Sequence, residues 1–141
     1  MINLVRAKEI RAGVDNEVGA LARMMSFLVN HGINVETVAG YSDPDGRRQG
    51  SIIFITADNR KSIDKLIDNG YTDIEEHDVI VAELENRPGS LKNLSEILAS
   101  NKININYFYC TTCSSGCSAK VVFSTSDNDE AFRLLNATRG T

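Results

Sequence analysis

The sequence predicts an α+β fold made of two copies of one small β-α-β-β-α-β unit, because a long pattern occurs twice. The stretch Asp15-Asn16-Glu17-Val18-Gly19-Ala20-Leu21 is matched about 70 positions later by Glu85-Asn86-Arg87-Pro88-Gly89-Ser90-Leu91. The match continues downstream in two further pairs of segments: Gly32-Ile33-Asn34-Val35 with Lys102-Ile103-Asn104-Ile105, and Ile53–Asn59 with Val122–Asn128. A repeat of this length indicates two small domains, which we assign to residues 1–77 and 78–141.

The first repeat has the order of elements of a ferredoxin-like fold. Alternating apolar residues predict a strand over Lys8–Val14, and apolar residues at helical spacing predict a helix from Val18 to Asn30 that ends at Gly32. The remaining expected elements are the strand Ile33–Tyr41, the turn Ser42–Gly46, the strand Gln49–Thr56, the helix Lys61–Asn69 with Asp58 or Asn59 as its cap, and the strand Tyr71–Glu76.

The second repeat follows the same order but runs out of residues. Its expected elements are the strand Val79–Glu85, the helix Pro88–Asn101, the strands Ile103–Thr111 and Ser118–Ser124, and the helix Asn128–Asn136. Too few residues follow Asn136 for a normal fourth strand. Two alternatives stay open: the last strand is missing, or the N-terminal residues Ile2–Arg6 or a partner chain cover that sheet edge.

Composition excludes several classes of function. The net charge of −4 argues against a general binder of nucleic-acid backbones. No apolar stretch approaches the roughly 18 to 20 residues of a membrane span, and the N-terminus has no apolar segment typical of a signal peptide. The three cysteines are odd in number and crowded together, unlike a secreted disulfide framework. We therefore expect a cytoplasmic protein with no nucleic-acid or membrane partner.

The repeated stretch has the features of a strand, a tight polar turn and the start of a helix. In the second copy it follows the apolar run Val79–Ala82, and Pro88 suits the first turn of a helix because it has no N–H to donate. Gly89 allows close approach to the backbone. The start of a helix presents free N–H groups and favours a carboxylate or a phosphate.

These residues resemble the ACT domain, the small-molecule sensing module of many amino-acid biosynthetic enzymes. The turn Asn86-Arg87-Pro88-Gly89 is similar to that of the phosphoglycerate dehydrogenase regulatory domain, and the first copy is similar to the regulatory subunit of acetohydroxyacid synthase. Two departures are clear. Leu84 and Val14 stand where the dehydrogenase type has histidine, and Val18 replaces the turn proline. The departures argue against a serine site.

The resemblance implies a free amino acid bound at an interface between two ACT domains, beside the first strand-to-helix turn. An amino acid needs N–H donors for its carboxylate and carbonyl oxygens for its ammonium group, and both turns can supply them. An asparagine before a helix is also common as a simple cap or turn residue, so that alternative stays open. The implied ligand-binding residues are Asn16, Glu17, Val18, Gly19, Ala20 and Asn34 in the first repeat, and Asn86, Arg87, Pro88, Gly89, Ser90 and Asn104 in the second.

Cys110, Cys113 and Cys117 lie across the hairpin of the second repeat. Three thiolates suit zinc or an iron–sulfur cluster, but no fourth ligand is evident, and residues 110 and 113 of an extended strand point to opposite faces. A reversible Cys113–Cys117 disulfide and ordinary turn residues are the other two interpretations.

The sequence thus predicts a stand-alone tandem regulatory protein that binds an amino acid and modulates a partner enzyme of amino-acid metabolism. We expect a homodimer without catalytic residues, metal or cofactor, since no nucleophile, phosphate-loop or paired-carboxylate motif is present. The alternatives are a protein–protein interaction module without a ligand, or a metal- or redox-responsive module that uses the cysteine hairpin.

Overall fold

The computed structural model describes residues 1–42 and 49–139, and the chain divides into two compact units. The first unit is Lys8–His77, and the second unit combines Met1–Ala7 with Asp78–Thr141. From the sequence we assigned residues 1–77 to the first repeat, whereas the structure places residues 1–7 in the second unit. The reason is that one long strand, β1 (Asn3–Asp15), passes through both units.

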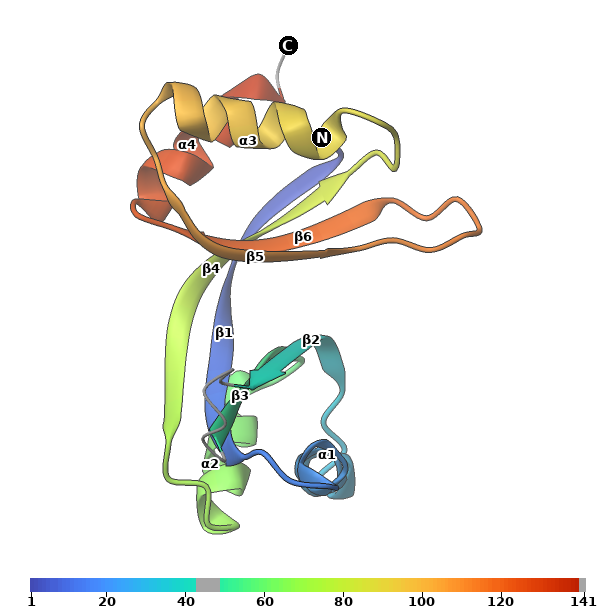
Figure 1. Cartoon of the computed structure of the whole chain (residues 1–141), viewed down its shortest axis with the longest axis vertical. Helices are drawn as coiled ribbons and strands as arrows, with labels where there is room; N and C mark the ends of the chain where they lie inside the picture. The colour runs from blue at the N-terminus through green and yellow to red at the C-terminus, as the bar shows by residue number, and fades with distance from the viewer. Residues whose placement is uncertain (43–48, 140–141) are drawn as a thin grey trace. The chain divides into compact units, whose positions relative to one another are not determined.

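The first unit has the predicted order of elements (Figure 1). After β1 come the helix α1 (Ala20–Asn30), the strands β2 (Val35–Ser42) and β3 (Gln49–Thr56), the helix α2 (Asn59–Asp68), and the start of the strand β4 (Ile74–Leu84). The strands lie in the order β2-β3-β1-β4. The predicted turn at Ser42–Gly46 falls almost entirely outside the described residues.

The second unit repeats this arrangement. The end of β4 is followed by α3 (Ser90–Ser100), β5 (Ile105–Thr111), β6 (Ala119–Thr125) and α4 (Asn128–Thr138). The strand order is β1-β4-β6-β5, the same relative order as in the first unit. β2 and β5 also carry a register shift at matching places, between Val35 and Thr37 and between Ile105 and Tyr107.

The fourth strand of the second unit is therefore present, and residues 1–7 supply it. The Ile2 N–H donates to the Glu83 carbonyl at 2.8 Å, which pairs the start of β1 with the end of β4. The first unit has a fourth strand of its own, the start of β4, and beside it the Gly13 N–H donates to the Asp73 carbonyl at 2.8 Å. The α+β fold of two ferredoxin-like repeats is confirmed, and the open question about the last strand has an answer in the N-terminal residues.

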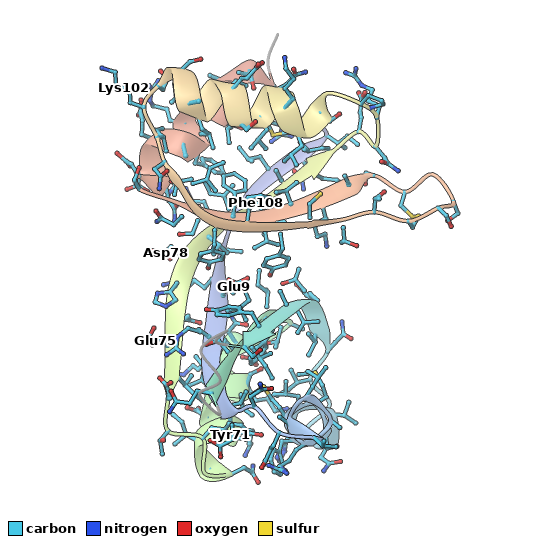
Figure 2. All side chains as sticks on the ribbon, viewed as in Figure 1. Glu9, Tyr71, Glu75, Asp78, Lys102 and Phe108 are labelled. Atoms are coloured by element: carbon cyan, nitrogen blue, oxygen red, sulfur yellow. A yellow bond between two sulfur atoms is a disulfide. The ribbon has the colours of Figure 1, made fainter. Side chains whose placement is uncertain are left out.

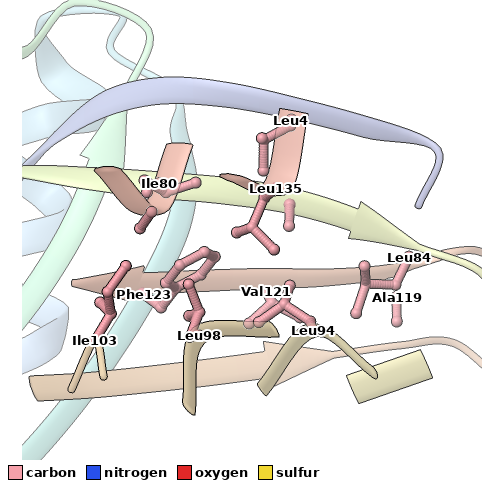
Figure 3. Packing of buried hydrophobic residues seen from close by; sticks show 12 residues of the cluster. Leu4, Ile80, Leu84, Leu94, Leu98, Ile103, Ala119, Val121, Phe123 and Leu135 are labelled. Atoms are coloured by element: carbon pink, nitrogen blue, oxygen red, sulfur yellow. The ribbon is translucent and has the colours of Figure 1, made fainter. Parts of the chain in front are cut away.

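Each unit has its own hydrophobic core between its helices and its sheet. Residues of the second core come from β1, β4, β6 and both helices, and Leu4 points into it near Leu135 of α4 (Figure 3). Arg6 lies over the Phe132 ring, 4.6 Å from its centroid, and also pairs with Asp129. The buried members of the first core are Ile10, Ala12, Met24, Leu28, Ile33, Ile52, Phe54 and Leu66.

Matching hydrogen bonds hold the start of the second helix of each unit. In the first unit Asn59 accepts from the Thr56 N–H at 3.0 Å and donates to the Lys8 carbonyl at 2.7 Å. In the second, Asn128 accepts from the Thr125 N–H at 2.8 Å and donates to the Asp78 carbonyl at 2.9 Å. Asp58 caps α2, as one of the two predicted residues, by accepting from the Lys61 N–H at 3.0 Å.

The first helix of each unit begins two residues later than predicted. α1 begins at Ala20 rather than Val18, and α3 begins at Ser90 rather than Pro88. The residues before them, Gly19 and Gly89, have φ values of 87° and 93°, a left-handed conformation that interrupts the helix and favours glycine. No helix in the described part of the chain is long and apolar enough to cross a membrane.

Candidate functional site

The turn between β4 and α3 leaves several backbone donors free. Within it, the Arg87 N–H donates to the Glu85 carbonyl at 2.9 Å and the Ser90 N–H donates to the Arg87 carbonyl at 3.3 Å. Among the described residues, no acceptor faces the N–H groups of Gly89, Leu91 and Lys92. The turn therefore offers a cluster of unpaired N–H donors at the positive end of a helix.

The asparagine of each turn is not used as a helix cap. The N-cap residues are Gly19 and Gly89, without any side-chain capping bond. The side chains of Asn16 and Asn86 are exposed and make no hydrogen bond with any described residue. The capping role that could have explained these asparagines is therefore absent, and both amide groups are available to a ligand.

A cavity of about 200 Å³ adjoins the turn of the second unit. The turn and the far end of the β5–β6 hairpin lie at the same end of this unit (Figure 1). The structure brings together three of the predicted residues here, namely Asn86, Arg87 and Ser90. The rest of the lining consists of Leu84, Glu85, Leu91, Cys110, Thr111, Thr112 and Ala119.

The first unit has a larger cavity, of about 730 Å³, beside its own turn. Glu17 and Ala20 are the predicted residues that line it. The same cavity is lined by the loop after α2, where Tyr71 (Figure 2) packs edge-on against Phe27 with ring centroids 5.9 Å apart. Burial raises the pKa of Tyr71, and the nearby Arg23 charge opposes that shift.

Charged side chains line the first cavity in pairs. Arg11 donates to Asp73 at 2.6 Å and to Glu75, which lies outside the lining, at 3.2 Å, and Arg23 lies 3.2 Å from Glu17. The hydrogen bonds from Arg11 lower the pKa of Asp73 and of Glu75, and they raise the pKa of Arg11. Glu75 also bonds His77 at 2.9 Å. The wall thus holds both signs of charge at ordinary pH.

Replacing Arg11 with glutamine is expected to raise the pKa of Asp73 and of Glu75, because both values are lowered mainly by its hydrogen bonds. A lowered carboxylate pKa stabilises the folded state above the unfolded pKa, and the stabilisation is lost as the pH falls through the lower folded value. The wild type should therefore lose stability in acid, below about pH 4, more steeply than the variant does. NMR titration of the carboxyl carbons measures the pKa values. Arg23→Gln is the control, and unchanged values in Arg11→Gln would contradict the assignment.

Asn34 and Asn104 do not lie beside the turns of their own units. Asp15 pairs with Gln49 at one end of β3, whereas Val35 pairs with Thr56 at the other end. The seven residue steps from Gln49 to Thr56 span about 23 Å at roughly 3.3 Å per residue. The second unit has the same arrangement, where Leu84 pairs with Ala119 and Ile105 pairs with Thr125. One turn and the second asparagine of the same unit therefore cannot hold one small ligand.

The three cysteines of the β5–β6 hairpin differ in their bonding. Cys113 and Cys117 are joined by a disulfide, and Cys110 is free and exposed. In the described part of the chain, no group of three or more His, Cys, Asp or Glu side chains could hold a metal ion. Of the interpretations given above, the disulfide describes this hairpin.

Sequence reasoning missed part of both cavities. It did not single out Arg11, Tyr71 or Asp73 in the first unit, or Thr111 and Thr112 in the second. The predicted topology could have pointed to the residues of the first cavity. β4 runs antiparallel to β1, so the loop before β4 has to lie beside the turn that follows β1.

Comparisons with known proteins agree with this description of the fold. No protein-family model and no curated protein matches the sequence. Among solved structures, protein BT0572 from Bacteroides thetaiotaomicron matches with a TM-score of 0.87 and 23% identity. The match covers 96% of this chain and 90% of the BT0572 chain. The ligand-free regulatory subunit of aspartate kinase from Thermus thermophilus has a TM-score of 0.65 and 15% identity over 95% of both chains. That of Thermus flavus has a TM-score of 0.66 and 14% identity over 95% of both.

These likenesses identify the class of fold. Two β-α-β-β-α-β units in tandem, matched over nearly their whole length by regulatory subunits, form a tandem ACT fold. The resemblance found in the sequence is confirmed at this level.

Proposed function

We propose that this chain is a non-catalytic regulatory module that binds a free amino acid at its strand-to-helix turns. The observation that carries the proposal is the turn of the second unit. It combines unpaired N–H groups, an asparagine side chain without an internal partner, and a cavity of about 200 Å³. The proposed binding residues are those predicted from the sequence, from Asn16 to Ala20 and from Asn86 to Ser90.

The chemistry of the turn fits both charged ends of an amino acid. The free N–H groups of Gly89 and Leu91 would receive the carboxylate at the positive end of α3. The side-chain oxygen of Asn86 would accept from the ammonium group. The Glu85 carboxylate accepts a hydrogen bond from the Arg87 guanidinium at 2.5 Å, and this pair would form the polar rim of the cavity.

The first unit offers the same elements around a wider space. The N–H groups of Gly19 and Leu21 have no acceptor among the described residues, and Asn16 lies in the same turn. The Arg23–Glu17 pair would supply both signs of charge to a larger ligand. We therefore propose that both turns bind, with the smaller cavity taking the smaller ligand.

The comparisons support a regulatory role. Aspartate kinase has separate regulatory subunits of this fold, and the match covers nearly all of this chain. By analogy, an amino acid bound here would favour one conformation of the module and so modulate a partner enzyme of amino-acid metabolism in the cytoplasm.

We further propose that the module is a homodimer. β2 and β5 each have an outer edge without a neighbouring strand in the described structure. Each exposes a large apolar side chain, Val38 on β2 and Phe108 on β5 (Phe108 is labelled in Figure 2). A second chain could also bring Asn34 or Asn104 to a turn that its own unit cannot reach. A mass near 15.5 kDa by light scattering would contradict the dimer.

A thermal-shift screen against the twenty amino acids tests the function. A hundredfold excess over the dissociation constant of a site present only in the folded state adds about 2.7 kcal/mol to the free energy of unfolding. Asn86→Ala should then weaken binding about tenfold or more, because a hydrogen bond to a charged group is lost. Asn101→Ala, at the other end of α3, is the matched control and should bind normally. Asn16→Ala tests the first turn in the same way.

A screen in which no amino acid shifts the unfolding temperature would contradict ligand binding. The second candidate function, a protein–protein interaction module, would then be favoured, because the exposed edges of β2 and β5 do not depend on any ligand.

A further inference from the structure

The cysteine hairpin is a special feature of the second unit. All three cysteines belong to the second repeat, and the position that matches Cys110 in the first repeat is Gly40. Cys113 and Cys117 are bonded across a separation of four residues, with their Cα atoms 5.4 Å apart. That spacing is within the normal range for disulfides.

The two sulfurs have different surroundings. Cys117 is exposed, whereas Cys113 is half-buried. The Sγ atom of Cys113 accepts from the Cys117 N–H at 3.1 Å and lies 3.2 Å from the Ser115 hydroxyl, which is farther, 3.9 Å, from the Sγ atom of Cys117. Donors placed at a sulfur stabilise its thiolate form, so Cys113 is the better leaving group and Cys117 the sulfur open to attack.

We propose that Cys113 and Cys117 form a reversible redox site that reacts with low-molecular-mass thiols and disulfides. A thiolate attacks the Cys117 sulfur, forms a mixed disulfide and releases the Cys113 thiolate, which takes a proton from water. A second small thiol then releases Cys117. The net reaction turns one protein disulfide and two small thiols into two protein thiols and one small disulfide, and the reverse reaction closes the loop.

The hairpin is connected to the cavity from both of its ends. On one side Cys110, Thr111 and Thr112 line the cavity directly. On the other side Ser118 donates to Glu83, and Ala119 pairs with Leu84 at the end of β4, just before the turn with Asn86. The disulfide therefore closes the loop whose two flanking segments, residues 110–112 and Ala119, line the cavity.

Oxidation should preorganise the cavity, and reduction should loosen its wall. An ordered site spends less binding free energy on ordering its own residues, so the oxidised protein is expected to bind more tightly. This last step depends on the proposed function, because it takes the cavity to be the amino-acid site. The redox reaction itself does not depend on it.

Counting free thiols in glutathione buffers tests the redox site. As the buffer changes from reduced to oxidised glutathione, alkylation should fall from three labelled cysteines to one. Cys110→Ser should change from two to none, and the double variant Cys113→Ser with Cys117→Ser should stay at one. A wild-type count that is the same in all buffers would overturn the proposal.

Hydrogen exchange tests the link to the cavity without any ligand. Reduction should speed amide exchange in residues 84–91 and 110–119, and the double variant should exchange like the reduced protein in either buffer. The turn at residues 15–21 is the internal control and should not change. Equal exchange at residues 84–91 in both redox states would overturn the link.

The same amino-acid screen, run in both redox states, separates the two proposals. The redox proposal predicts a dissociation constant about fivefold or more lower in the oxidised protein. Equal affinities would contradict the coupling but leave the proposed function standing. No binding in either state would contradict the proposed function, while the exchange data still decide the redox link.

Discussion

Leu4→Ala is expected to destabilise the second unit by about 3 kcal/mol or more, the usual cost of removing a buried leucine side chain. Leu4 is 4% exposed and packs in the core of the second unit, although it lies 70 residues before the start of β4 in the sequence. The loss of stability is expected because residues 1–7 supply a strand of the second unit. Urea unfolding measures its size, and hydrogen exchange should place it in residues 78–139.

The neighbouring Val5 provides the control for this prediction. Its side chain is 43% exposed, so Val5→Ala should cost less than about 1 kcal/mol. If Leu4→Ala were no more costly than Val5→Ala, the assignment of residues 1–7 to the second unit would be wrong.

Phe54→Ala is expected to have the second large effect, about 3 to 5 kcal/mol, because its ring is fully buried and would leave a cavity. Phe54 lies on β3 and packs with Ile10, Met24 and Leu66. The loss should be concentrated in the first unit. Phe123 occupies the matching position of the second core, so Phe123→Ala should cost a similar amount there.

Urea unfolding measures the loss of stability in each variant, and hydrogen exchange followed segment by segment shows which unit has lost it. Phe108→Ala is the control, because this ring is 58% exposed and should be removable for less than about 1 kcal/mol. If Phe54→Ala and Phe123→Ala raised exchange in the same segments, the two cores would not be separate.

The repeat and its topology could be predicted because they depend on local patterns. Alternating and helical spacings of apolar residues marked each element, and the doubled Asn-x-x-Gly turn aligned the two copies. The contribution of residues 1–7 to the second unit could not be fixed in this way. Ile2–Arg6 and Lys8–Val14 are adjacent in the sequence, and only long-range pairing shows that they belong to different units.

The candidate site shows the same division. The turns around Asn16 and Asn86 were found from sequence, since glycine and asparagine at a helix start have a clear local meaning. Arg11 and Asp73 were not found, because they are 62 residues apart and meet only through the pairing of β1 with β4. The alternation rule separated Cys110 from Cys113, but the choice between disulfide and metal required the conformation of the loop.

Backbone amide shifts recorded with the twenty amino acids test the central claim most directly. The proposed function predicts that one or more of them will move the amide signals of residues 87–92 or 17–22, and that Asn86→Ala or Asn16→Ala will weaken the response of its own turn. Amide signals in both turns that stay in place with all twenty amino acids would contradict an amino-acid site in this protein.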